Sequence, residues 1–144
     1  MKWLILFHVL GACVWTGGHL VLSLGFLPAA IKTRDLSVIL NFEKYYERIG
    51  IPALLLQVIT GVWMALLYVP FPYWFSWATP HHVYLWTKLG LLVATLVLAI
   101  HARFFIFPKL TVMQLPSLAA HIIMATVLAV AFVVTGLSFR LVFF

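Results

Sequence analysis

The chain has 144 residues, of which 65% are hydrophobic and only 8% are charged. An average soluble domain carries roughly 25% charged residues, so this chain has too few to cover a water-facing surface. Its three acidic residues all lie in one connection between apolar segments, which argues against di-iron carboxylate centres and paired-carboxylate hydrolysis, and its single cysteine, Cys13, excludes an internal disulfide, a CxxC pair and a thiolate zinc site.

Four apolar segments are long enough to cross a bilayer, because a spanning helix needs about 20 apolar residues. The first span is predicted over residues 3–27 and ends at Pro28. The polar stretch that follows, residues 32–48, has apolar residues at helical spacing and predicts a short interfacial helix. The second span is predicted over residues 49–69.

An aromatic segment, residues 70–82, precedes the third span. Its three prolines forbid a regular helix, and its aromatic side chains are typical of the membrane–water interface. The third span is predicted over residues 83–107 and the fourth over residues 117–139, with Ser117 as its N-cap. The sequence therefore predicts a single all-α membrane domain: an up-down bundle of four transmembrane helices, with a short interfacial helix before the second.

Basic residues are distributed unevenly over the two ends of this bundle. Six flank the first and third connections and two lie at the other end: Lys32, Arg34, Lys44, Arg48, Arg103 and Lys109 against Lys2 and Arg140. This asymmetry predicts a multi-pass protein of a bacterial inner membrane with both termini on the periplasmic side. The basic residues flank spans rather than forming a patch, so we expect the lipid bilayer as partner and no nucleic acid. The large lipid-facing surface of four spans is compatible with a homo-oligomer.

Ionisable residues within the spans are functional candidates, because burying them in hydrocarbon is costly. At a rise of ~1.5 Å per residue, His19, His101 and His121 fall at one level near the inner end. His8 and Lys88 fall at a second level near the outer end. Two separate sites are therefore expected, one on each side of the membrane.

The first span combines histidines with small residues on one face. His8 and His19 lie about 20° apart at ~100° per residue, with Trp15 between them and Gly18 beside them. A flat macrocycle between helices needs an axial nitrogen ligand without bulk beside it. This pattern predicts one or two molecules of haem b, and copper is the alternative because neutral imidazole also binds copper.

The inner haem is expected to be held by His19 and His101, with His121 as the alternative ligand. Arg103 lies at the same level and is expected to meet the haem propionates. Whether His19 faces His101 or His121 depends on helix rotations that the sequence does not fix.

The outer site is expected to use His8, with Lys88 as a ligand, a cation for a substrate carboxylate or a catalytic residue. Trp15 lies between the two levels, where it would relay an electron across the membrane. In the copper reading, the four histidines at positions 8, 19, 101 and 121 are the metal ligands.

Three segments resemble the HemJ-type and CopD-type membrane proteins. FHVLGACVWTGGHL carries His8 and Trp15, FEKYYERIGIPALLLQVITGVW carries Pro52, and YLWTKLGLLVATLVLAIHARF carries Lys88 and His101. The HemJ-type resemblance implies a haem-binding protoporphyrinogen oxidase in which the residues matching His8 and Lys88 are the functional pair. The CopD-type resemblance implies a role in copper uptake or resistance.

Two departures from the HemJ type favour a CopD-like relative. His19 is an additional histidine, and the fourth span adds His121 while lacking the Asn-Glu that precedes this helix in the HemJ type. The sequence thus predicts a b-type haem protein of the CopD/HemJ-like group in membrane electron transfer, an oxidoreductase if it is an enzyme. A quinone, a porphyrin or a redox protein is its expected partner. A copper-binding or copper-transport protein, a protoporphyrinogen oxidase and a structural subunit are the alternatives.

Overall fold

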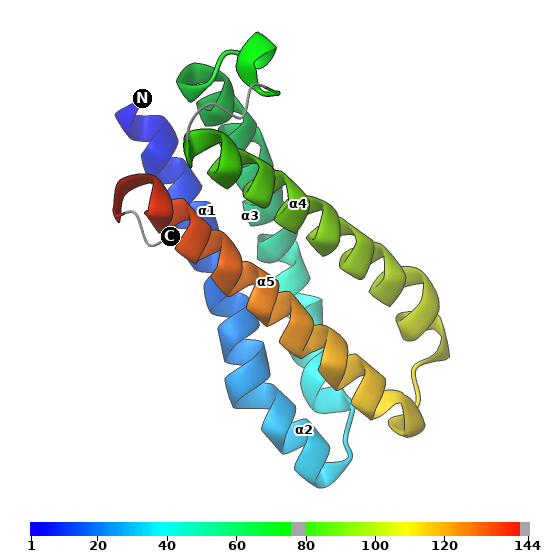
Figure 1. The fold of residues 1–144 in the computed structure, drawn as a ribbon. Coiled ribbons are helices and arrows are strands. Elements are labelled where there is room, and N and C mark those ends of the chain that lie inside the picture. Colours follow the sequence, from blue (N-terminus) through cyan, green and yellow to red (C-terminus); the bar gives the residue numbers. More distant parts are fainter. Residues whose placement is uncertain (76–79, 142–144) are drawn as a thin grey trace.

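Four long apolar helices make up the computed structural model, which describes residues 1–75 and 80–141, and the side chains of residues 1–75 and 81–138. The four segments able to cross a membrane are Lys2–Thr33, Ser37–Tyr68, His81–Lys109 and Val112–Ser138. They alternate in direction, so the last helix ends at the end of the molecule where the first begins (Figure 1). The predicted all-α, four-span fold is confirmed.

The first span continues past the proline that was expected to end it. α1 (Lys2–Val21) passes through a π-helical turn, Leu22–Phe26, into α2 (Leu27–Thr33). Pro28 lacks an N–H and would clash with the carbonyl four residues earlier in a regular helix. The wider π turn just before Pro28 relieves this conflict, so the helix continues. The prediction that the span ends at Pro28 is therefore wrong.

α2 is followed by its C-cap residue, Arg34, whose backbone is left-handed with φ 54° and ψ 33°. An L-residue in this conformation costs about 1–2 kcal/mol, whereas glycine adopts it freely. We expect Arg34→Gly to raise the free energy of unfolding by about 0.5–1 kcal/mol, with Arg34→Ala as the control for the lost side chain. Thermal unfolding in detergent measures the difference. A Gly variant no more stable than the Ala variant would contradict this expectation.

The second span is longer than predicted. α3 (Ser37–Tyr68) includes the helix expected in the polar stretch, which runs directly into the span instead of forming a separate interfacial helix. Gly50 and Pro52, near the start of the span, do not interrupt it, and both lie within the continuous helix. At ~1.5 Å per residue this helix is about 48 Å long, so it extends beyond a hydrocarbon core of about 30 Å.

The first part of the aromatic segment, residues 70–75, contains a 3-10 turn, Phe71–Tyr73, in place of a regular helix, and residues 76–79 lie outside the described part of the chain. α4 (Pro80–His101) begins within the last part of that segment. It is extended by a second π turn, Ala102–Ile106, and a 3-10 turn, Phe107–Lys109.

The fourth span begins two residues before its predicted N-cap. A 3-10 turn, Val112–Gln114, leads into α5 (Leu115–Leu141). Ser117 is therefore inside the first turn of α5 and not its N-cap, so that prediction is wrong. Pro116 is tolerated there because the first N–H groups of a helix have no intrahelical acceptor.

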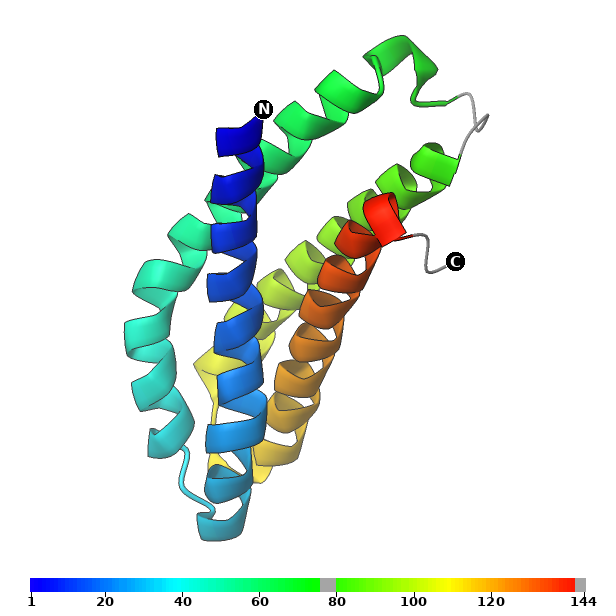
Figure 2. The same ribbon diagram turned by 90° about the vertical axis from the view of Figure 1, so that its left-hand side faces the viewer.

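Each helix packs against one or two neighbours, and a cluster of buried residues lies at the end that holds the two short connections. α1 packs against α3 on one side and α5 on the other, α5 also packs against α4, and α3 and α4 have at most marginal contact. The buried core lies at the connection end and consists of Leu22, Leu27, Ala30, Ile39, Ile106, Leu115, Leu118, Ala119 and Ile122. Towards the other end, α3 crosses α1 and continues beyond it (Figure 2). This buried cluster therefore lies at the end of the bundle where the inner level of histidines was predicted.

Candidate functional site

Two histidines meet between the last two helices. His101 is the final residue of α4 and His121 lies in the second turn of α5. His101 Nδ1 and His121 Nε2 are 2.9 Å apart. The ring centroids are 5.0 Å apart and the ring planes differ by 12°. Their predicted common level is therefore confirmed, and the two imidazoles contact each other directly.

The hydrogen bonds of this pair define which nitrogen carries each proton. His121 Nδ1 lies 2.9 Å from the carbonyl oxygen of Ser117, which only accepts, so Nδ1–H is the donor. His121 Nε2 is then the acceptor of the bond from His101 Nδ1–H. A histidine whose outer N–H is bound by a backbone carbonyl has its other nitrogen oriented for a metal.

The pair lies at the surface near the inner end of the bundle. His101 is exposed and His121 is half-buried. The Phe105 ring lies against His101, with centroids 5.3 Å apart and an interplanar angle of 18°. Arg103, expected beside haem propionates, is exposed in the π turn that follows His101.

His19 belongs to a different cluster, between α1 and α3. His19 Nδ1 lies 2.9 Å from the carbonyl oxygen of Trp15, and the two rings are 4.5 Å apart. The Tyr46 hydroxyl donates to the same carbonyl at 2.9 Å and lies 3.4 Å from His19 Nδ1. From α5, the Thr126 hydroxyl donates to the His19 carbonyl at 3.2 Å. The structure thus places His19 with Trp15 and Tyr46.

Tyr46 is a site residue that the sequence did not reveal, since it counted only as one apolar position of an amphipathic helix. It is 9% exposed, and its ring lies directly against Gly18 of α1. A Cβ on Gly50, one turn further along α3, would stand 3.0 Å from the same ring. Gly18, expected beside a cofactor, therefore accommodates an aromatic side chain of the protein.

His8 and Lys88, the residues predicted for the outer level, have partners on α3 and α5 respectively. His8 Nδ1 lies 2.8 Å from the Thr60 hydroxyl of α3, which itself donates to the Leu56 carbonyl at 2.6 Å. Lys88 is half-buried, with Nζ 3.5 Å from where a Cβ on Gly136 of α5 would stand.

The four histidines expected as ligands are thus distributed over three places. His101 and His121 lie together, His19 lies with Tyr46, and His8 lies with Thr60. Within the described ranges, no group of three or more His, Cys, Asp or Glu side chains is arranged to hold a metal ion. Any copper site in this part of the chain therefore needs either two histidines alone or a ligand of another type.

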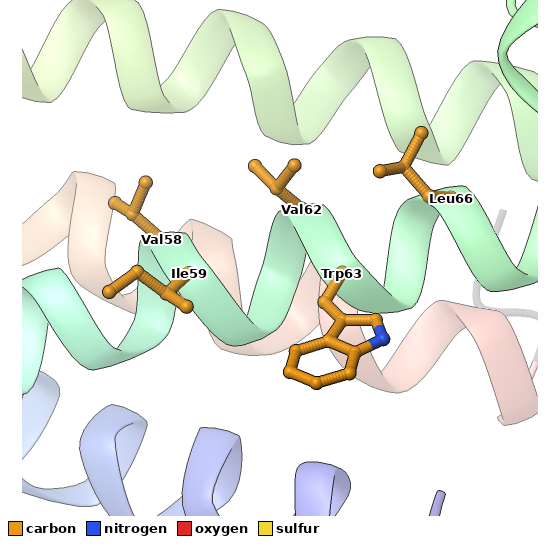
Figure 3. Close-up of a pocket in the computed structure, with 5 residues that line it drawn as sticks. All are labelled: Val58, Ile59, Val62, Trp63 and Leu66. Atoms are coloured by element: carbon orange, nitrogen blue, oxygen red, sulfur yellow. The ribbon is translucent and has the colours of Figure 1, made fainter.

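Two mainly apolar grooves lie on the described part of the molecule. A shallow groove of about 550 Å³ is lined by α3 residues only: Val58, Ile59, Val62, Trp63 and Leu66. Val58, Val62 and Leu66 point towards the ribbon of α4 (Figure 3). A second groove, of about 760 Å³, runs between the first span and α5 and has Lys32 among its lining residues. Neither lining includes a histidine.

Comparison with known proteins gives one family. The family model described as copper resistance protein D, CopD, matches residues 40–139. The matched range contains α4, most of α3 and nearly all of α5, and hence both members of the histidine pair. The comparison with curated proteins and the comparison with solved structures found no match. The CopD-like part of the predicted resemblance is confirmed, whereas the HemJ-like part stays a prediction.

Proposed function

The chain belongs to the copper resistance protein D family, and from this premise we propose that it is a copper-binding membrane protein whose ion is held by His101 and His121. The observation that carries the proposal is the direct contact of these two imidazoles at 2.9 Å. Imidazole nitrogen is a suitable ligand for copper in either oxidation state. Here α4 supplies one imidazole and α5 supplies the other.

An ion would take the place of the proton that the two rings share. With the Zn–N length of about 2.0–2.1 Å as a guide, two nitrogen ligands of one ion stand about 3.3–4.2 Å apart. His101 Nδ1 and His121 Nε2 are now 2.9 Å apart. For tetrahedral coordination, these two nitrogens would therefore need to move apart by about 1 Å or less. His121 is already held by the Ser117 carbonyl in the tautomer that exposes Nε2.

The location of the histidine pair along the chain and in the bundle supports the proposal. Both histidines lie within residues 40–139, whereas His8 and His19 precede this range. The pair lies at the end of the bundle with six of the basic residues, all of them exposed. By the positive-inside rule, the proposal puts copper at the cytoplasmic end of a bacterial inner-membrane protein with periplasmic termini.

Haem b is the second candidate. His8 and His19 turn from one face of α1 towards α3. Because they lie eleven residues apart on one helix, each would be one axial ligand of a separate haem, whose second ligand would come from a facing helix. In this reading Trp15 relays electrons to a quinone or a redox protein, and Lys88 binds a carboxylate of a porphyrin. A macrocycle also needs a flat cavity bordered by its ligands, and neither described groove is lined by a histidine. A copper ion needs no such cavity, so copper is the first candidate.

Metal analysis and an optical spectrum of the detergent-purified protein distinguish the two candidates. We expect copper in a ratio of about one ion per chain after loading, and no absorption band of reduced haem. A sharp low-spin α-band at full occupancy in the pyridine haemochrome assay would instead establish haem b. A protein that takes up neither copper nor haem would refute both candidates.

A further inference from the structure

We propose that the groove between the first span and α5 binds one anionic phospholipid, with an acyl chain in the groove and the phosphate at Lys32. This inference is independent of the proposed copper site, because no histidine lines the groove. The groove has a volume of about 760 Å³. One wall comes from the π turn Leu22–Phe26 and from α2, and the other wall comes from α5. The chemistry of these walls indicates the occupant.

Both walls of the groove offer hydrocarbon contact. Leu24 on one wall is 75% exposed, and Val127 on the other is 55% exposed. The two hydroxyl groups of the lining already bond to the backbone of their own spans. Ser23 donates to the carbonyl three residues earlier at 3.3 Å, and Thr126 donates to the carbonyl four residues earlier at 2.8 Å. The walls therefore suit an acyl chain, which has no polar group to offer them.

The one charged residue of the lining, Lys32, lies at the polar end of the groove. It follows Ser23 by nine residues, so the groove extends roughly 13 Å from this end into the span. Lys32 is exposed, as is Arg34 two residues later. The carboxylate of Asp35, the next residue, accepts the N–H of Ser37 at 2.9 Å and is thereby held at the start of α3. A cation at the mouth of an apolar groove matches a phosphate that continues into an acyl chain.

The charge of Lys32 also favours a lipid over a second copy of the chain. In a two-fold dimer, both copies would bring the same groove, and hence both Lys32 side chains, to one interface. No acidic residue lines the groove to offset this repulsion. The distribution of basic residues predicts that this end is cytoplasmic. Anionic lipids give the cytoplasmic leaflet its negative surface potential, and basic pockets between helices on this side bind their headgroups.

The test measures lipid binding to the full-length protein in detergent by native mass spectrometry. Phosphatidylglycerol and phosphatidylcholine with identical acyl chains are the anionic and zwitterionic probes. Lys32→Gln removes the charge, and Lys109→Gln is its control, since Lys109 is exposed at the same end but outside the lining. Val127→Trp fills the groove. Its control is Val134→Trp, because Val134 lies seven residues further along the same face of α5, is 41% exposed and is outside the lining.

We expect the wild type to retain one phosphatidylglycerol per chain and to bind phosphatidylcholine more weakly. Lys32→Gln should lower the affinity for phosphatidylglycerol about fivefold, the loss expected for one basic residue at an anionic surface. Val127→Trp should abolish retention of the lipid, while both controls bind it like the wild type. Equal affinity for the two lipids, or unaltered affinity in Lys32→Gln, overturns the proposal. A wild-type dimer that Val127→Trp dissociates would also overturn it, by assigning the groove to a second copy of the chain.

Discussion

Replacing His121 with alanine is expected to lower the copper affinity of the protein by more than about 100-fold. The change removes one of the two imidazoles that define the proposed site, and loss of a mere outer-shell partner already costs 10–100-fold. It also removes His121 Nε2, the hydrogen-bond acceptor that lies 2.9 Å from His101 Nδ1. His101→Ala should have the same effect, because each ring orients the other.

The two variants together test whether the histidines act as one site. If they do, the double variant binds copper no more weakly than either single variant, because the first substitution already destroys the site. His81→Ala is the matched control, since His81 is exposed in the first turn of α4, at the opposite end of the same helix. Chelator competition gives the affinities, and size-exclusion profiles show that each variant is folded. Single variants with wild-type affinity would remove the pair from the copper site.

The positions of His8 and His19 on one helical face were predictable because they depend only on the period of an α-helix. Both side chains reach partners on the same neighbour, Thr60 and Tyr46 of α3, as the predicted common face requires. The common level of His101 and His121 was predictable for a similar reason, since the helical rise fixes depth within a span. Local geometry thus decided both of these features.

The partner of His101 was not predictable, because it depends on which helices pack together. α4 packs along α5, while it has at most marginal contact with α1, the helix that carries His19. His101 therefore meets His121, and His19 turns to Tyr46. Helix neighbours in a membrane are chosen by the packing of small residues over whole helix faces, which the spacing of single histidines does not report.

The end of the first span was predicted wrongly because Pro28 was taken as its terminator. Pro28 and Pro108 each follow a π-helical turn, Leu22–Phe26 and Ala102–Ile106. At Pro28 the helix continues to Thr33, whereas at Pro108 it tightens into a 3-10 turn and ends. The outcome depends on whether packing beyond the proline compensates for the lost hydrogen bond, and Leu27 and Ala30 supply such packing after the first π turn.

Gly18→Ala is expected to lower the free energy of unfolding by about 1–3 kcal/mol, the usual cost of overfilling a packed interior. A Cβ at this position would overlap the Tyr46 ring. The ring has little freedom to move, because it stacks on Phe42 and its hydroxyl bonds to the Trp15 carbonyl. The substitution should therefore separate α1 from α3. Gly17→Ala is the matched control, since no atom lies within 4 Å of its added Cβ.

The overlap with Tyr46, and not a general requirement for glycine, is the reason for this expectation, and a double-mutant cycle tests that reason. If the ring is the obstacle, Gly18→Ala costs little once Tyr46 has been replaced by alanine, so the two changes are far from additive. Unfolding in detergent gives the four stabilities. A full loss from Gly18→Ala in the Tyr46→Ala background would show that something other than the ring requires glycine, such as a cofactor beside His19. The same cycle therefore also tests whether this face of α1 serves helix packing or ligand binding.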